Sequence, residues 1–261
     1  MKLQDATVLI TGGSSGIGLE LARQLAARGN TVIITGRRLS ALQAAKAETP
    51  GLHIRVCDVS DAGAVAELRV WLETSFPDLN VLINSAGVMR KIDLQAERSL
   101  DDLTREIDTN LKGLMWMVAA LLPQLKRQEK AAIINLSSGL AYVPMAISPI
   151  YSTTKAGIHA YTRALRAQLT LTAVEVFEVA PPGTDTPMFH GDFTPEDLRG
   201  PTPMSAPDVA AQAIRGIERG APEIRIGLAK TMQLLSRLAP ALAFRLVSRS
   251  AALRMAQAHV N

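Results

Sequence analysis

The chain has 261 residues, of which 48% are hydrophobic and one, Cys57, is a cysteine. This length and hydrophobic content exclude a disordered polymer and allow a sizeable buried core. A single cysteine excludes an internal disulfide framework and a zinc site built from cysteines. The first residues lack the features of a secretory signal, and the sequence holds no uninterrupted apolar stretch long enough for a spanning helix. We therefore expect a cytoplasmic protein.

The formal net charge of +4 is unevenly distributed along the chain. Residues 224–261 hold six basic residues and no acidic one, whereas residues 1–223 hold 22 basic and 24 acidic residues. The excess of positive charge therefore belongs to the tail. A nucleic-acid-binding domain usually spreads its basic residues over a binding face, so this distribution argues against a nucleic-acid partner.

Short runs rich in β-branched residues alternate with helix-like segments. The predicted strands lie at 7–10, 31–34, 53–56, 81–83, 133–136 and 174–177, with a weaker seventh at 223–226. The predicted helices lie near 16–28, 39–48, 61–75, 99–128, 151–171 and 207–219. This alternation predicts an α/β fold: a Rossmann-like, doubly wound, seven-stranded parallel sheet with helices on both faces. Residues 181–207, rich in proline and glycine, are expected to form a surface flap.

No linker, low-complexity tract or repeat divides the sequence, so we expect a single domain. Residues 1–228 are predicted to form the Rossmann-fold body, and residues 229–261 a basic amphipathic helical extension of it. For the extension, packing against a sister subunit, docking within the chain and contact of residues 230–257 with an anionic membrane are all open. A homo-oligomer, dimer or tetramer, is expected.

The first predicted strand runs into a glycine-rich turn, TGGSSGIG at residues 11–18, and then into a helix. Gly12 permits a sharp exit from the strand, Gly16 lets backbone N–H groups approach a pyrophosphate, and Gly18 lets the helix pack closely on the sheet. An ordinary glycine-rich turn is the alternative. The strand before it and the helix after it favour a dinucleotide-binding site.

The second predicted strand ends where a dinucleotide site reads the adenine ribose. An NAD site usually has an acidic side chain there, but this sequence has Arg37 and Arg38. A guanidinium can bind a 2′-phosphate through two charge-assisted hydrogen bonds, with Ser14 as a further donor. The sequence therefore predicts NADP(H) as the cofactor in preference to NAD(H), and it predicts no metal.

Further motifs follow in chain order: Asp58-Val59, NSAG at 84–87, Asn110, Ser138 and YSTTK at 151–155. Together with the glycine turn, they resemble the short-chain dehydrogenase/reductase family of the single-domain type, over roughly residues 5–187. The family implies an NADP(H)-dependent oxidoreductase that interconverts a small-molecule carbonyl and alcohol, of unknown substrate. The alternatives are a non-catalytic NADP sensor and a membrane-associated adaptor that uses the C-terminal helix.

Tyr151 and Lys155 are four residues apart and so lie on one face of a helix, where the ammonium is expected to lower the pKa of the phenol. The resemblance then assigns the catalytic roles. Tyr151 exchanges the proton, Lys155 also binds the nicotinamide ribose, Ser138 orients the carbonyl, and Asn110 holds a water of the proton relay. The neighbouring Ser137 is expected to point to the opposite face.

The resemblance also implies a cofactor-binding set. Within it, Asp58 bonds the adenine amino group, Val59 supplies a backbone contact, and three residues of the NSAG motif line the ribose and diphosphate path. The whole set is Gly12, Ser14, Ser15, Gly16, Ile17, Gly18, Arg37, Arg38, Asp58, Val59, Asn84, Ala86, Gly87, Tyr151, Lys155, Pro181, Thr184 and Thr186.

One departure from the family pattern concerns the residues after the sixth predicted strand. Pro182 stands where the family has a glycine, and proline removes an N–H donor. We therefore expect the contact with the nicotinamide carboxamide to differ from that of the family. This Pro-Pro pair and the long basic tail resemble the DltE-like oxidoreductase subgroup.

Overall fold

The structure is a computed structural model that describes residues 1–188, 190–194, 197 and 201–248. Its main strands are β1 (Thr7–Thr11), β2 (Thr31–Gly36), β3 (His53–Val56), β4 (Leu79–Asn84), β5 (Ala131–Leu136), β6 (Val174–Ala180) and β9 (Glu223–Arg225). Its α-helices are α1 (Gly16–Ala26), α2 (Leu39–Glu48), α3 (Ala62–Ser75), α4 (Leu100–Glu106), α5 (Gly113–Leu125), α6 (Pro149–Gln168), α7 (Ala206–Glu218) and α8 (Leu228–Leu238). These positions confirm the predicted alternation.

The seven main strands form one parallel sheet in the order β3-β2-β1-β4-β5-β6-β9. The weakly predicted seventh strand is thus a true member at the edge. The order reverses at β1, which lies between β2 and β4. In such sheets the ligand crevice lies beyond the carboxyl ends of the strands at this reversal.

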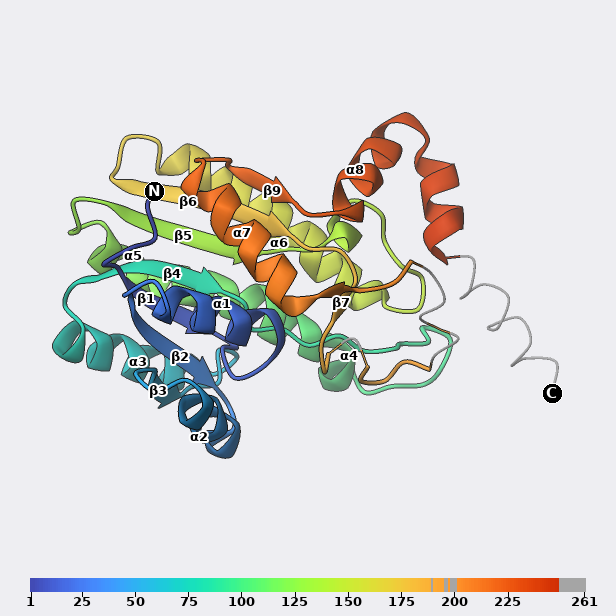
Figure 1. Cartoon of the computed structure of the whole chain (residues 1–261). Helices are drawn as coiled ribbons and strands as arrows, with labels where there is room; N and C mark the ends of the chain where they lie inside the picture. Colours follow the sequence, from blue (N-terminus) through green and yellow to red (C-terminus); the bar gives the residue numbers. More distant parts are fainter. Residues whose placement is uncertain (189, 195–196, 198–200, 249–261) are drawn as a thin grey trace.

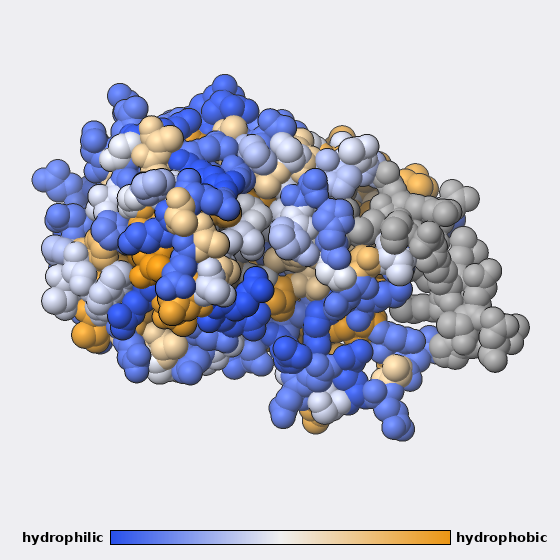
Figure 2. All heavy atoms as spheres, turned by 60° about the horizontal axis from the view of Figure 1, so that its bottom comes forward, coloured by the Kyte–Doolittle hydropathy of each residue, from blue (hydrophilic) through white to orange (hydrophobic). Residues whose placement is uncertain are grey.

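Helices cover both faces of the sheet (Figure 1). Along β1 the side chains alternate, so Val8 and Ile10 join one core with residues of α1, α2 and α7. Leu9 joins the opposite core with residues of α3, α5 and α6. The predicted doubly wound, single-domain fold is confirmed. Hydrophilic side chains dominate the face that Figure 2 turns forward, and apolar ones form small separated spots there.

The helix predicted over 99–128 is interrupted in the structure. Between α4 and α5 lies a π-helical segment, η1 (Ile107–Lys112), which contains Asn110. A π-helical turn admits one extra residue and re-aims the side chains that follow it, and such turns are frequent at functional sites. The prediction of one continuous helix was therefore wrong at this point.

The described residues of the predicted flap include two short strands, β7 (Thr184–Asp185) and β8 (Met204–Ser205), which pair with each other. A short 3₁₀ helix, η2 (Gly139–Ala141), follows β5. After α8 a second helical segment spans 240–248, and residues 249–261 of the predicted extension lie outside the described residues. Among the described residues, none of the helices combines the length and apolar character that crossing a membrane requires.

Candidate active site

A cavity of about 280 Å³ lies at the carboxyl ends of the strands. Its lining includes all the predicted cofactor residues except Asn84 and Thr184. The sequence assigned no cofactor role to the remaining residues of the lining: Gly36, Cys57, Ser85, Val88, Thr109, Leu136, Ser137, Pro187 and Met188. Most of these are apolar or offer only backbone groups, so no chemical signal marks them in the sequence.

The glycine turn is shaped by close backbone contacts. Gly12 has φ +66°, and a Cβ there would lie 2.7 Å from the Cα of Ala86. A Cβ on Gly18 would lie 2.5 Å from the carbonyl oxygen of Gly12. Gly16 has φ +55°, and a Cβ there would lie 3.1 Å from the Cγ2 of Thr186 in the flap. The turn is therefore a cradle that side chains would fill, as a bound diphosphate requires.

The end of β2 carries the two arginines. Arg37 and Arg38 are exposed and line the cavity, and neither forms an ion pair within the described part of the chain. Ser14 lies beside them, because its Oγ would be 3.3 Å from a Cβ on Gly36. This end of the cavity therefore offers two guanidinium groups and a hydroxyl to an anion.

Asp58 and Val59 follow β3 at the same rim. One oxygen of Asp58 accepts hydrogen bonds from the N–H (2.9 Å) and the hydroxyl (2.7 Å) of Ser60, which fixes the carboxylate. The neighbouring Cys57 is buried, and its burial, with the charge of Asp58, raises the pKa of its thiol to about 11. Cys57 thus stays a neutral thiol at neutral pH, as a wall of the cavity.

Tyr151 and Lys155 reach the cavity from one face of α6, and both side chains are buried. The Lys155 ammonium lies 5.4 Å from the centre of the Tyr151 ring and donates to the carbonyl oxygen of Leu136 at 2.9 Å. Ser138 begins η2, where its Oγ accepts from the N–H of Leu140 at 3.1 Å and is hydrogen-bonded to Tyr151. The three predicted catalytic side chains therefore meet at one wall.

Burial controls the protonation of this group. It raises the pKa of Tyr151, with a further rise from the charge of Glu106, while the hydrogen bond with Ser138 acts in the opposite direction. Burial lowers the pKa of Lys155 to about 8. The sequence predicted a tyrosine pKa lowered by the ammonium. The net direction in the structure is upward, because removal of the phenolate from water outweighs the favourable contacts.

Asn110 lies beside this group within η1. Its Oδ1 accepts from the N–H of Val88 at 2.8 Å, and its Nδ2 donates to the Val88 carbonyl at 2.9 Å and to the hydroxyl of Thr154 at 3.1 Å. Both amide hydrogens are thus used to join the loop after β4 to α6. The side chain fixes two walls of the site. The predicted water would therefore have to bind the backbone groups of Asn110 or the second lone pair of its Oδ1.

Two predicted cofactor residues point away from the cavity. Asn84 donates to Asn135 at 2.9 Å, and Asn135 donates to Thr162 at 3.0 Å, which ties β4, β5 and α6 together in the interior. Thr184 donates to the carbonyl of Pro182 at 2.9 Å and so holds the start of the flap. The structure therefore gives both residues contacts with the protein instead of the expected place in the lining.

Ser137 also lines the cavity, and its hydroxyl is hydrogen-bonded within the protein. Its hydroxyl donates to the fully buried Glu178 at 2.5 Å, and the second oxygen of that carboxylate is 2.7 Å from Nδ1 of His159. His159 lies one turn beyond Lys155 on α6. These contacts join the ends of β5 and β6 to the helix that carries the predicted catalytic pair.

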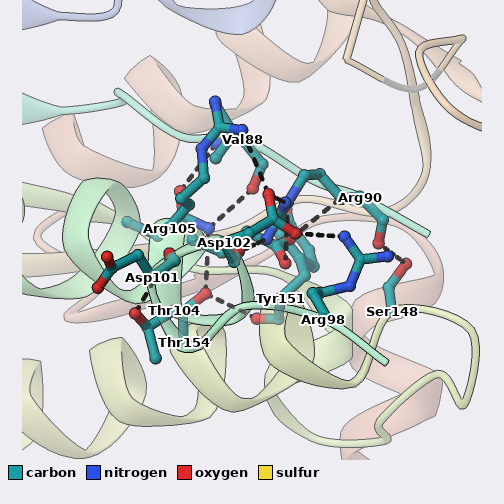
Figure 3. A network of polar contacts seen from close by, with 12 residues as sticks. Val88, Arg90, Arg98, Asp101, Asp102, Thr104, Arg105, Ser148, Tyr151 and Thr154 are labelled. Atoms are coloured by element: carbon teal, nitrogen blue, oxygen red, sulfur yellow. Dashed lines mark hydrogen bonds and ion pairs between the residues drawn. The ribbon is translucent and has the colours of Figure 1, made fainter. Parts of the chain in front are cut away.

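Figure 3 shows a polar network at the other side of Tyr151, which the sequence did not reveal. Asp102 accepts from Arg90 at 2.8 Å and also pairs with Arg98, whose hydrogen bond is the main reason that the pKa of Asp102 falls to about 2. Glu106 is fully buried and accepts from the N–H of Arg90 at 3.0 Å. Burial raises the pKa of Glu106.

A small apolar cluster joins the flap to two neighbouring loops. Ile147 and Phe193 are buried there, with Met89, Met145 and Ala146 packed against them. These side chains come from the loop after β4, the loop before α6 and the flap. Lys91 donates to Asp197 at 2.9 Å and so joins the first loop to the flap. The cluster thus packs the flap against these two loops through apolar contacts.

The sequence profile of the family described as short chain dehydrogenase matches residues 6–197. The chain belongs to this family. The chain is 40% identical over 229 residues to the uncharacterized oxidoreductase DltE of Bacillus subtilis (strain 168), a match that covers 86% of this chain and 89% of the relative. It is 36% identical over 176 residues to the NADP-dependent 3-hydroxy acid dehydrogenase YdfG of Salmonella typhi, a match that covers 67% of this chain and 71% of the relative.

Solved structures share the fold. A short chain dehydrogenase from Burkholderia cenocepacia J2315 in complex with NADP has a TM-score of 0.82 at 24% identity and covers 95% of this chain and 99% of that one. One from Burkholderia phymatum in complex with NAD has a TM-score of 0.79 at 22% identity and covers 90% and 94%. With the sequence relatives, these findings make the chain an NAD(P)-dependent enzyme of the DltE-like subgroup, and they do not favour a non-catalytic sensor or adaptor.

Proposed function

We propose that this enzyme interconverts a carbonyl and an alcohol by NADP(H)-dependent hydride transfer, with Tyr151 as the general acid and base. The observation that carries the proposal is that one cavity joins the glycine turn and Arg37 to the buried pair Tyr151 and Lys155. An anion site at one end and a proton donor at the other fit a nucleotide cofactor that reaches from one to the other.

When bound, NADP(H) supplies or accepts the hydride. The residues of this chain would hold it at four places: the glycine turn at the diphosphate, Arg37 and Arg38 with Ser14 at the 2′-phosphate, Asp58 at the adenine, and Lys155 at the nicotinamide ribose. Two observations support this assignment: the close backbone contacts at the glycine turn, and two exposed arginines that form no ion pair within the described residues.

The proton chemistry follows from burial. Because the pKa of Tyr151 is raised, its phenol is protonated at neutral pH and can donate to the oxygen of a carbonyl during reduction. Ser138, hydrogen-bonded to Tyr151, orients the same carbonyl oxygen. The ammonium of Lys155, with its pKa near 8, stabilises the phenolate that remains. Asn110 holds the loop and helix that carry these groups.

The preference for NADP(H) is tested by titrating NADPH and NADH. A charge-assisted contact with the 2′-phosphate is worth about 1.5–3 kcal/mol, so NADPH should bind roughly 10- to 100-fold more tightly. Arg37→Asp should remove or reverse this preference. Arg219→Asp, which makes the same charge change at an exposed residue after α7, is the matched control and should leave it intact. Equal affinities in the unmodified enzyme would contradict the assignment.

We infer the substrate class from the apolar cluster formed by the flap and the two neighbouring loops. Met89, Met145, Ile147 and Phe193 carry no charge, which favours an apolar or mixed carbonyl compound. The relative YdfG is named for 3-hydroxy acids, so these acids belong in the same test. NADPH oxidation with a panel of ketones, aldehydes and quinones, and NADP⁺ reduction with 3-hydroxy acids, ranks the classes. We expect apolar carbonyl compounds to rank first.

A further inference from the structure

The C-terminal surface consists of the exposed residues of α8 and of the helical segment 240–248. Half of the twelve large apolar side chains that are exposed in the described residues belong to it, within a stretch of nineteen residues. They are Leu228, Leu234, Leu238, Leu242, Phe244 and Leu246, with exposed fractions of 44–74%. Leu234 and Leu238 are four residues apart, as are Leu242 and Leu246, so each pair shares a helix face. Apolar clusters of this kind mark interaction sites.

The charges on this surface have one sign. Lys230, Arg237 and Arg245 are exposed among the apolar side chains. The sequence contains no acidic residue after Glu223. The surface therefore combines an apolar face with basic residues alone, the composition of helices that lie in the interface of a bilayer with anionic lipid.

The inner side of the two helical segments is fixed to the enzyme. Ala229 and Ala243 are buried, and a Cβ on Gly139 of η2 would lie 2.8 Å from the sulfur of Met232. The hydroxyl of Ser248 accepts from the N–H of Ala146 at 3.3 Å. The inner contacts use Met232 together with small and polar residues, and six large apolar side chains are left exposed on the outside. The segments sit at the carboxyl ends of β5 and β6 (Figure 1).

We propose that the C-terminal surface binds the headgroup and upper acyl region of a bilayer that contains anionic phospholipid. A second copy of the chain is a poorer occupant. A twofold interface through this surface would bring Lys230, Arg237 and Arg245 of both copies together, with no acidic residue of this segment to offset them. An anionic lipid surface satisfies both the apolar side chains and the charges. Binding in this way turns the end of the sheet that carries the cavity toward the bilayer.

Cosedimentation of the full chain with vesicles tests the proposal without any measurement of turnover. Vesicles of phosphatidylcholine with 30% phosphatidylglycerol should bind the protein at low salt. Vesicles of phosphatidylcholine alone should bind it weakly. Binding should fall as salt rises, because each basic residue contributes about fivefold and this contribution is screened. Failure of the proposed oxidoreductase activity would leave these results unaffected.

Two variants separate the apolar and the charged contributions. Leu234→Ser with Leu238→Ser should weaken vesicle binding roughly tenfold. The matched control is Leu39→Ser with Leu171→Ser, two exposed leucines elsewhere on the enzyme. Lys230→Gln, Arg237→Gln and Arg245→Gln together should weaken binding to anionic vesicles about a hundredfold. Their control is the same change at Lys46, Lys126 and Lys130, which are also exposed. Unchanged thermal unfolding shows that each variant folds.

Three results would overturn the proposal. The first is the absence of binding to anionic vesicles at low salt. The second is salt-independent binding that is equally strong for neutral and anionic vesicles, which would show that anionic lipid plays no part in the binding. The third is a combination of two findings. The protein does not bind vesicles, and light scattering shows a dimer that dissociates in the Leu234→Ser, Leu238→Ser variant. That result would assign the C-terminal surface to a second copy of the chain.

Discussion

At the scale of single residues, the protonation of Tyr151 depends on a carboxyl group that no motif marks. Glu106 is fully buried, and its charge adds to the effect of burial on the tyrosine pKa. In Glu106→Gln the hydrogen bond from the N–H of Arg90 can persist, because the glutamine carbonyl also accepts. The variant therefore removes the negative charge of Glu106 and keeps this hydrogen bond.

We expect Glu106→Gln to shift the pH profile of alcohol oxidation toward acid. Oxidation needs the phenolate of Tyr151, and removal of a neighbouring negative charge lowers the pKa at which that phenolate forms. Initial rates of NADP⁺ reduction between pH 6 and about 11 give the midpoint. Asp102→Asn, in the same network but not among the groups that shift the tyrosine pKa, should leave the midpoint in place. An unshifted midpoint in Glu106→Gln would disprove this role.

The same scale shows why part of the site could be predicted. Gly12, Tyr151 and Lys155 belong to spaced motifs whose chemistry requires those residue types, and the structure puts them in one cavity. Glu106 could not be found this way, since a glutamate in a helical pattern is ordinarily solvated, and only the packing reveals its burial. The upward shift of the Tyr151 pKa was missed for the same reason.

At the scale of elements, capping residues explain where several helices begin. Asp61 caps α3 and accepts from the N–H groups of Gly63 (2.7 Å) and Ala64 (3.2 Å). Ser99 caps α4 and Ser205 caps α7 in the same manner. Strand and helix positions were predictable because such caps and the apolar periodicity agree. The π-helical turn η1 was not, because one extra residue hardly disturbs the apolar pattern of a 30-residue helix.

Loss of the α3 cap should be measurable. Asp61→Ala leaves two N–H groups without their acceptor and should reduce the free energy of unfolding by about 1 kcal/mol. In a chain of this size the unfolding midpoint should then fall by about 2–4 °C. Asp61→Asn keeps an oxygen acceptor and is the control, with a midpoint close to that of the unmodified enzyme. A midpoint unchanged in Asp61→Ala, measured by calorimetry, would show that the cap contributes nothing.

At the scale of the whole molecule, the sequence predicts a homo-oligomer. The C-terminal surface is assigned above to lipid, so the remaining apolar side chains must supply the subunit contacts. Leu94, before α4, and Leu100, at the start of α4, are exposed, and Met115 and Trp116 are half-buried on α5. Light scattering at micromolar concentration should give a dimer or tetramer of the 28.0 kDa chain. Leu100→Ser should weaken this assembly. A mass of one chain would contradict the prediction.

The most direct test of the proposed chemistry is the rate of NADPH oxidation by Tyr151→Phe with the best carbonyl substrate of the panel. The substitution removes one hydroxyl from a buried ring, so NADPH affinity and the unfolding midpoint should stay close to those of the unmodified enzyme. The turnover rate should fall by about 10²–10⁴, the usual effect of losing a general acid. A Tyr151→Phe enzyme that keeps its turnover rate within a few-fold would contradict the assignment of Tyr151 as the proton donor.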